Sequence, residues 1–151
     1  MYMIKSMNEG VLYTAIATAS PEGREGHVRS SDGRLEVELA MPVELGGSGD
    51  SGTNPEQLFA AGYAACFTSA LHTVGRRERV ATTGAGATAR VGVKRAASRS
   101  FALVVELDVS LPELSQEEAE RIVSIAHEVC PYSNAIRGNV PVELSVQGAA
   151  A

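Results

Sequence analysis

Residues 58–71 contain no charged side chain, and this stretch constrains the fold more than any other part of the sequence. It reads LFAAGYAACFTSAL. The residues before it favour the start of a helix, because Asn54 suits the N-cap, Pro55 the first turn and Gln57 a capping box. We therefore predict a helix over residues 55–75. A helix that is apolar on every side is buried on every side, so we expect other segments to cover it completely.

Three short strands are predicted before this helix. Residues 12–20 are rich in Thr, Ile and Ala and predict the first strand. Asp32 and Gly33 lie between residues 27–30 and residues 34–39. An Asp-Gly step between two β-like runs is a strong signal for a hairpin.

The sequence after the helix predicts two strands, a second helix and a last strand. The two strands cover residues 85–95 and 101–109, and the last strand covers residues 140–146, where apolar and polar positions alternate. The predicted order of elements is β-β-β-α-β-β-α-β. Strands that are joined by hairpins and interrupted by two helices indicate an α+β fold with antiparallel sheets, and not a doubly wound fold.

The second helix has clear signals at both ends. Ser115 and Glu118 form a capping box at its start. Its apolar stripe follows the i, i+3, i+4 pattern and consists of Ala119, Ile122, Val123, Ala126 and Val129. Pro131 disfavours helical geometry at Cys130, so we predict that the helix ends or kinks there.

Composition narrows the class of protein. A chain of 151 residues has the size of one domain, and we predict a single domain over residues 1–151. Its 44% hydrophobic and 21% charged residues exclude a disordered chain and a membrane protein. A net charge of −5 without tryptophan argues against nucleic acid as a partner. The N-terminus lacks the pattern of a signal peptide, so we expect a cytoplasmic protein. The glycine-rich residues 46–52 lack the lysine of a phosphate-binding loop.

The two cysteines, Cys66 and Cys130, are the candidate reactive residues. They are too few for a disulfide scaffold or a structural zinc site, and the right number for one redox pair. Burial in the apolar helix raises the pKa expected for Cys66, and the dipole at a helix C-terminus disfavours a thiolate at Cys130. Neither thiol is activated by its own helix. To react, Cys66 needs a cation from elsewhere in the fold.

Other interpretations of the cysteines stay open at this point. Both can be small buried hydrophobic residues, because free cysteine is among the most buried residue types. His127 and Cys130 have the i, i+3 spacing that can share a metal ion, although a zinc site needs three or four ligands. A nucleophilic Cys–His pair can in principle use His27, His72 or His127, but no local signature supports it.

Two segments, each holding one cysteine, carry a specific resemblance. Residues 52–67 read GTNPEQLFAAGYAACF, and residues 127–139 read HEVCPYSNAIRGN. Both resemble the signatures of the organic hydroperoxide resistance (Ohr) family within the OsmC/Ohr superfamily. The likeness extends over nearly the whole chain and includes GREG at residues 23–26. One departure is Ile136, which stands where the family usually has threonine.

The resemblance implies a thiol-dependent peroxidase and a role for four residues. Cys66 matches the peroxidatic cysteine of the family, and Cys130 matches the resolving cysteine. Arg24 matches the arginine that activates the peroxidatic thiolate, and Glu56 matches the carboxylate that pairs with and orients that arginine. The implied reaction reduces alkyl or fatty-acyl hydroperoxides to alcohols through a Cys66 sulfenic acid and a Cys66–Cys130 disulfide, as a defence against oxidative stress.

The resemblance also implies partners. It points to an intertwined homodimer with a central buried helix and with active sites at the interface. It points to a dihydrolipoyl group or a lipoylated protein as the reductant, in preference to thioredoxin. From the composition and the lack of metal-ligand spacing we expect no cofactor, no metal, no nucleic acid and no membrane. An OsmC-like enzyme with a broader peroxide preference and a non-catalytic redox sensor or ligand-binding dimer stay open as alternatives.

The spacing of Glu56 and Cys66 adds a geometric expectation. They are ten residues apart, which corresponds to about 15 Å along the axis of a continuous helix. Glu56 therefore cannot touch Cys66 of its own chain. We expect either that Arg24 bridges part of this gap or that Glu56 serves the site of the other subunit.

Overall fold

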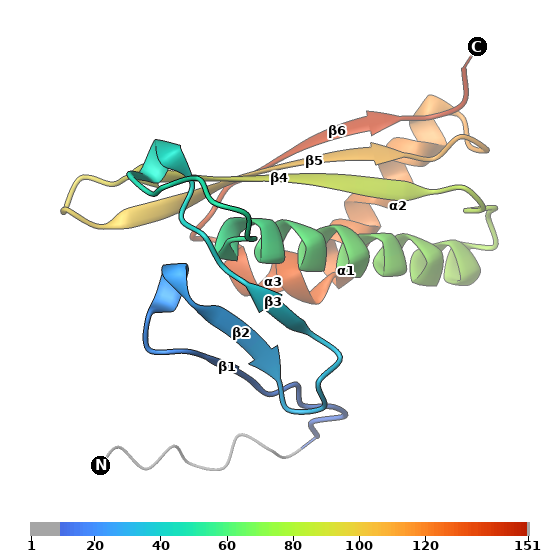
Figure 1. Cartoon of the computed structure of the whole chain (residues 1–151). Helices are drawn as coiled ribbons and strands as arrows, with labels where there is room; N and C mark the ends of the chain where they lie inside the picture. The colour runs from blue at the N-terminus through green and yellow to red at the C-terminus, as the bar shows by residue number, and fades with distance from the viewer. Residues whose placement is uncertain (1–9, 151) are drawn as a thin grey trace. The chain divides into compact units, whose positions relative to one another are not determined.

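The computed structural model describes residues 10–150 of the chain (Figure 1). The chain divides into two compact units, Met1–Asn54 and Pro55–Ala151, which we call the N-terminal unit and the C-terminal unit. Strands occur in both units and the long helices in the second, so the predicted α+β class is confirmed. The prediction of one domain over residues 1–151 stays a prediction. None of the described helices combines the length and the hydropathy needed to cross a membrane.

Three short antiparallel strands form the N-terminal unit, in the order β1-β2-β3. Its elements are β1 (Ala17–Ala19), η1 (Gly23–Glu25), β2 (His27–Ser30), β3 (Glu36–Glu38) and η2 (Val43–Leu45). The predicted first strand over residues 12–20 is confirmed only for its last part, because only residues 17–19 pair with β2.

The predicted hairpin between β2 and β3 is confirmed, and its turn chemistry explains it. Gly33 has a φ of +71°, a conformation that glycine adopts without steric cost. Oδ1 of Asp32 accepts hydrogen bonds from the Ser30 hydroxyl at 2.6 Å and from the backbone N–H of Arg34 at 3.1 Å. The aspartate therefore closes the turn, and the glycine permits its backbone geometry.

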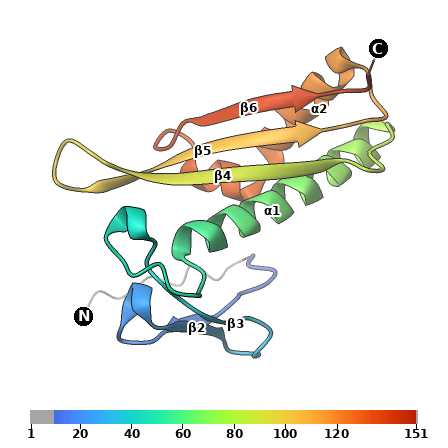
Figure 2. The same cartoon turned by 45° about the horizontal axis from the view of Figure 1, so that its top comes forward.

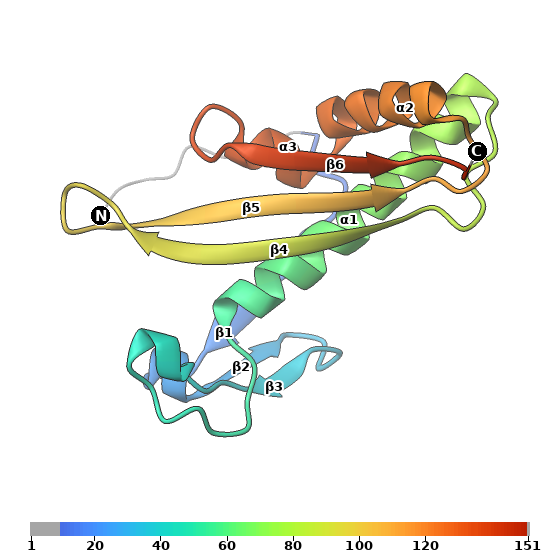
Figure 3. The same cartoon turned by 90° about the horizontal axis from the view of Figure 1, so that it is seen from above.

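The C-terminal unit is a three-stranded sheet with its helices on one face (Figure 1, Figure 3). Its elements are α1 (Pro55–Glu78), β4 (Gly86–Arg95), β5 (Phe101–Ser110), α2 (Gln116–Val129), α3 (Pro131–Ile136) and β6 (Val142–Gln147). Figure 2 shows the strands side by side in the order β4-β5-β6. The predicted strands and the two predicted helices are confirmed within a few residues at their ends.

The prediction of purely antiparallel sheets is wrong for the last strand. β4 and β5 pair antiparallel over their full length, but β6 pairs parallel to β5, with Val105 opposite Val142 and Ser110 opposite Gln147. The alternation of apolar residues is the same in both pairings, so it cannot distinguish them. The long connection through α2 and α3 gives the chain the length that a parallel crossover needs.

The second helix, α2, begins and ends as predicted. Oγ of Ser115 accepts the backbone N–H of Glu118 at 3.3 Å, and the helix stops at Val129. Ala119, Ile122, Val123 and Ala126 are buried. The short helix α3, which starts at Pro131, was not among the predicted elements, although proline is a common first residue of a helix.

The helix α1 is buried on one face only, whereas the sequence predicts a helix that is covered on every side. Tyr63, Phe67 and Leu71 are buried against the core of the C-terminal unit, as are Ala70, Val74 and Gly75. Ala61, Ala65 and Ser69, which follow one another at every fourth position, are exposed in the single chain. The expectation is therefore wrong for one chain, because this face carries only small residues and lies away from the core.

Candidate active site

The two cysteines meet in the C-terminal unit although they are 64 residues apart in the sequence. Sγ of Cys130 lies 3.7 Å from Sγ of Cys66. Both are free thiols, because a disulfide bond is about 2.05 Å long. Cys66 comes from the middle of α1, and Cys130 lies between α2 and α3. The fold thus brings together the two residues that the sequence singles out, at a distance from which a disulfide can form after a small movement.

The backbone at Cys130 explains why its side chain is held there. Cys130 has an extended conformation, as expected for a residue before proline. Its N–H donates to the carbonyl oxygen of Ala126 at 2.8 Å, which completes the last turn of α2. Its own carbonyl oxygen accepts the N–H of Asn134 at 3.0 Å, which begins α3. Two helices therefore fix the position of this residue.

The environments of the two thiols differ. Cys130 is fully buried, whereas Cys66 is half-buried. Burial raises the pKa of the Cys66 thiol, as predicted from its helix. The backbone N–H of Tyr132 donates to the Cys66 sulfur and acts in the opposite direction, but burial prevails. The C-terminal unit thus holds Cys66 close to Cys130 but does not by itself lower the pKa of the Cys66 thiol.

Aromatic rings surround the start of the thiol-bearing segment of α1. The centroid of the Phe59 ring lies 6.0 Å from that of Tyr63 and 5.8 Å from that of Tyr132, and both pairs meet edge to face. Tyr132 also lies over Gly62, where an added Cβ would come within 2.5 Å of the Tyr132 hydroxyl oxygen. Glycine at this position therefore lets the Tyr132 ring lie directly on α1. The result is an apolar wall close to Cys66.

A chain of three polar side chains lies within this apolar region. The hydroxyl groups of Tyr63 and Ser133 are 2.7 Å apart, and Nδ1 of His127 lies 2.9 Å from Oγ of Ser133. Tyr63 and Ser133 have no exposed surface. Burial and, secondarily, the charge of Arg137 lower the pKa of His127. The sequence analysis did not predict this hydrogen-bonded chain, although Ser133 and His127 both lie in the second signature segment.

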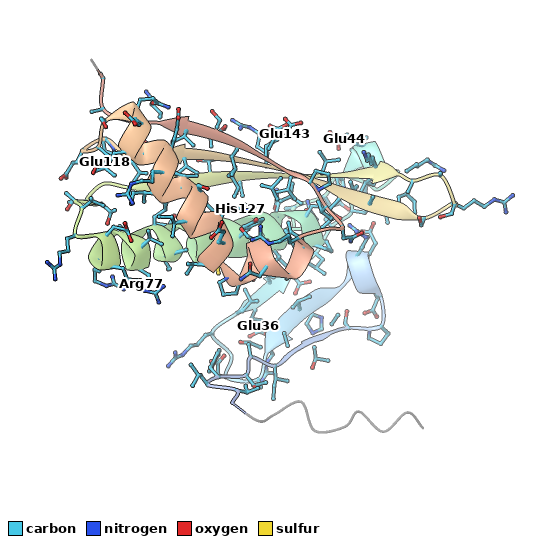
Figure 4. All side chains as sticks on the ribbon, turned by 180° about the vertical axis from the view of Figure 1, so that it is seen from behind. Glu36, Glu44, Arg77, Glu118, His127 and Glu143 are labelled. Carbon is cyan, nitrogen blue, oxygen red and sulfur yellow. The ribbon has the colours of Figure 1, made fainter. Side chains whose placement is uncertain are left out.

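The metal and nucleophile interpretations of His127 receive no support from its surroundings. Figure 4 shows His127 on α2, close to the turn into α3. Its Nδ1 is bonded to Ser133. Within residues 10–150, no three His, Cys, Asp or Glu side chains are grouped so that they could hold a metal ion.

Arg24 and Glu56 lie on different units. Arg24 is in η1 of the N-terminal unit. Glu56 is in the first turn of α1, which continues without interruption past Cys66 to Glu78. The continuous helix confirms the separation of about 15 Å along its axis between Glu56 and Cys66. Glu56 therefore does not touch Cys66 within one chain.

Comparisons with known proteins identify the family. The family model described as OsmC-like protein matches residues 47–145, which include both cysteines. The organic hydroperoxide resistance protein of Xanthomonas axonopodis pv. citri (strain 306) is 48% identical over 139 residues, covering 91% of this chain and 96% of that protein. The chain belongs to the Ohr family of the OsmC/Ohr superfamily.

Other Ohr proteins agree with this chain in sequence and in structure. Organic hydroperoxide resistance protein OhrA of Bacillus subtilis (strain 168) is 48% identical over 137 residues, which cover 89% of this chain and 96% of OhrA. The crystal structure of the organic hydroperoxide resistance protein OsmC from Legionella pneumophila has a TM-score of 0.86 and 52% identity, covering 91% of this chain and 98% of that chain. The predicted family is therefore confirmed.

Proposed function

We propose that this Ohr-family chain is a two-cysteine peroxidase that reduces organic hydroperoxides to alcohols and thereby defends the cell against oxidative stress. The observation that carries the proposal is the separation of 3.7 Å between Sγ of Cys66 and Sγ of Cys130. The relatives named for organic hydroperoxide resistance support the choice of substrate. The cytoplasm is the compartment in which such a thiol pair is returned to its reduced form.

Activation of Cys66 requires a cation, because burial alone raises the pKa of its thiol. Arg24 supplies this cation in the proposal, on the basis of its position in the family motif. Its guanidinium keeps its charge at any physiological pH and presents a fork of donors. Glu56 orients that fork by a bidentate contact, which a carboxylate and a guanidinium form readily. The pair stabilises the Cys66 thiolate against the cost of burial.

The oxidation half of the cycle consists of two substitutions at sulfur. The Cys66 thiolate attacks the terminal oxygen of the hydroperoxide, the O–O bond breaks, and the alkoxide leaves and takes up a proton to become the alcohol. Cys66 is now a sulfenic acid. Cys130 attacks the Cys66 sulfur, the S–S bond forms, and the hydroxide leaves with the Cys130 proton as water. The disulfide protects Cys66 from further oxidation.

The reductive half uses an external dithiol of the dihydrolipoyl type. One of its sulfurs attacks the Cys66–Cys130 disulfide and forms a mixed disulfide, and its second sulfur then displaces the protein thiol. Two protein thiols and one oxidised lipoyl disulfide result. A small dithiol or a flexible lipoyl arm suits a half-buried cysteine better than a folded thioredoxin does.

The lining of the site favours organic substrates over hydrogen peroxide. Phe59 on α1 and Tyr132 on α3 present partly exposed aromatic rings, 5.8 Å apart between centroids, on the segments that carry Cys66 and follow Cys130. Burial of an alkyl or fatty-acyl chain against such surfaces contributes about 0.8 kcal/mol for each CH₂ group. Hydrogen peroxide has no carbon and gains nothing from this lining.

The working unit in the proposal is an intertwined homodimer with active sites at its interface. Ala61, Ala65 and Ser69 form an exposed face of small residues on α1, which would allow a second helix to approach closely. Because Glu56 stands about 15 Å from Cys66 along α1, it can serve the Cys66 of the other chain. Mixed dimers of Cys66→Ser and Glu56→Ala chains test this arrangement. Activity above that of both parents supports it, and the lack of any gain excludes it.

The experiment that tests the proposed function is turnover of cumene hydroperoxide with dihydrolipoamide as the reductant. Thioredoxin with its reductase and hydrogen peroxide as substrate are run in parallel. We expect the fastest turnover with the organic hydroperoxide and dihydrolipoamide. Equal rates with hydrogen peroxide would favour an OsmC-like enzyme of broader preference. A disulfide without turnover by any dithiol would indicate a redox sensor and contradict the proposal.

A further inference from the structure

A hydrogen-bonded chain joins the helix of Cys66 to the segment of Cys130. Tyr63 on α1 bonds through its hydroxyl to Oγ of Ser133 on α3 at 2.7 Å, and Nδ1 of His127 on α2 lies 2.9 Å from the same oxygen. Tyr63 and Ser133 are fully buried. The hydrogen-bonded chain therefore links α1, α2 and α3 inside the core. The peroxidase chemistry described above does not use it.

This hydrogen-bonded chain of side chains runs beside the two thiols. Tyr63 is three residues before Cys66 on α1, and Ser133 is three residues after Cys130. The hydroxyl contact and the sulfur contact therefore join the same two segments. Three residues correspond to about 4.5 Å along a helix axis, which is less than one turn. The Tyr63–Ser133 bond is a second fixed point next to the contact between the sulfurs.

His127 holds the other side of Ser133. All hydroxyl protons are used if Tyr63 donates to Ser133 and Ser133 donates to Nδ1 of a neutral His127. Burial, together with the charge of Arg137, lowers the pKa of His127 and favours the neutral ring. Nη2 of Arg137 also donates to the carbonyl oxygen of His127 at 2.7 Å. Each member of the chain has a partner, so Ser133 and the neighbouring Cys130 are held in one place.

We infer that Tyr63, Ser133 and His127 are positioning residues for the resolving cysteine. This role rests on the proposed function. The three residues hold Sγ of Cys130 within 3.7 Å of Sγ of Cys66, so that the disulfide forms before a second peroxide reaches Cys66. The movement that remains is short, because a disulfide bond is about 2.05 Å long. A misplacement of about 1 Å is enough to slow such a preorganised step strongly.

Glutathione disulfide separates the resolving step from peroxide chemistry. The Cys66 thiolate attacks one sulfur of glutathione disulfide, releases one glutathione thiolate and becomes a mixed disulfide. The Cys130 thiolate, after giving its proton to solvent, then attacks the Cys66 sulfur and releases the second glutathione thiolate. The first step reports the reactivity of Cys66. The second step reports the position of Cys130, and neither step requires peroxidase activity.

The test compares Tyr63→Phe with a matched control in the full chain. Tyr63→Phe keeps the ring and removes the hydroxyl that bonds to Ser133. Thr82→Val removes a hydroxyl that lies 3.1 Å from Nδ1 of His72, towards the other end of α1. Rapid acid quenching followed by mass spectrometry gives the rates of both steps. We expect Tyr63→Phe to slow the second step about tenfold without changing the first, and Thr82→Val to change neither. Equal second-step rates in the two variants would overturn the inference.

Ser133→Ala provides a second variant, because it disconnects Tyr63 and His127 at once. We expect a larger decrease of the second-step rate than in Tyr63→Phe, and more Cys66 sulfinic acid after a fixed dose of cumene hydroperoxide. Thermal unfolding of each variant verifies that folded proteins are compared. If wild-type Cys66 resists the peroxide while the glutathione rates change as expected, the proposed function fails and the positioning role stands. A wild-type protein that forms no Cys66–Cys130 disulfide with glutathione disulfide overturns the positioning role.

Discussion

The N-terminal unit exposes most of its strands, whereas the C-terminal unit encloses a continuous core. Among the described residues before Pro55, Leu39 and Ala40 are the only buried hydrophobic residues. The C-terminal unit buries side chains from α1, β5 and α2 together, among them Leu71, Leu107 and Ile122. Burial of a leucine-sized side chain stabilises a fold by about 1.5–3 kcal/mol. Most of the hydrophobic stabilisation of the chain is therefore located in the C-terminal unit.

This difference separates two requirements of the proposed chemistry. Cys66, Cys130 and the chain of Tyr63, Ser133 and His127 all belong to the C-terminal unit, where close packing fixes their distances. The proposed activating cation, Arg24, belongs to the N-terminal unit. In the proposal, the pairing of the thiols therefore depends on the C-terminal unit alone, whereas the activation of Cys66 also requires Arg24 of the N-terminal unit. Substitutions can test each part separately.

Substitution of the cysteines has the largest expected effect. Cys66→Ser removes the proposed nucleophile, so we expect no measurable turnover of cumene hydroperoxide. Cys130→Ser leaves the nucleophile in place, so one oxidation of Cys66 per chain is still expected, detected as trapping of the sulfenic acid by dimedone. Full activity in Cys66→Ser would rule out the mechanism.

Substitution of Arg24 tests the contribution of the N-terminal unit. We expect Arg24→Ala to lower peroxidase turnover by about 10²–10³-fold, the usual effect of removing one preorganised electrostatic partner. Without the cation, burial sets the pKa of Cys66 above the ordinary thiol value of about 8.5. Alkylation of Cys66 should therefore require a higher pH in Arg24→Ala than in the wild type, because only the thiolate reacts.

Arg24→Lys is the matched control, because it keeps the charge and loses the fork of donors. We expect a pH profile between those of the wild type and Arg24→Ala. Identical alkylation profiles in the wild type and in Arg24→Ala would show that Arg24 does not activate Cys66.

A pair of leucine substitutions tests the difference in burial itself. Leu71 has no exposed surface and lies in the core of the C-terminal unit, whereas Leu35 is exposed and lies beside β3 in the N-terminal unit. We expect Leu71→Ala to lower the free energy of unfolding by about 2–5 kcal/mol, and Leu35→Ala to lower it by at most about 1 kcal/mol. Urea unfolding followed by circular dichroism measures both. Equal losses of unfolding free energy in the two variants would contradict the difference in burial between the two units.

The pH dependence of stability gives the smallest expected effect. The pKa of His127 in the folded state is lowered, chiefly by burial and further by Arg137. The unfolded chain then takes up the proton first, so stability falls as the pH decreases from about 6.5 towards the lower folded pKa. Urea midpoints between pH 8 and pH 5 measure this slope. We expect a shallower slope in His127→Gln and an intermediate one in Arg137→Gln. An unchanged slope in His127→Gln would show that His127 does not cause the pH dependence.

Local patterns in the sequence predicted most of the fold. The charge-free stretch with Pro55 before it predicted α1, and the Asp32-Gly33 step predicted the β2–β3 hairpin. The parallel pairing of β6 was not predictable from its alternation, because the same pattern fits either direction. The lack of charge does not predict the exposed face of α1 at Ala65, because small apolar residues occur on buried and on exposed helix faces alike.

The candidate site was predictable only in part. The sequence indicated Cys66 and Cys130 as a pair through two family signatures, and the 3.7 Å separation supports that pairing. The contact between Tyr63 and Ser133 joins residues that are 70 positions apart. No local periodicity contains such information, because it arises when α3 packs against α1. The roles of Arg24 and Glu56 rest on the family motif and stay predictions.

A single stoichiometric oxidation is the sharpest test of whether Cys66 and Cys130 form one redox pair. The reduced protein receives one equivalent of cumene hydroperoxide per Cys66, and its peptides are then analysed by mass spectrometry without reduction. We expect one equivalent of cumyl alcohol and a peptide cross-linked between Cys66 and Cys130, with the loss of two hydrogens. Formation of Cys66 sulfinic acid with a free Cys130 thiol, or no oxidation of either cysteine, would contradict it.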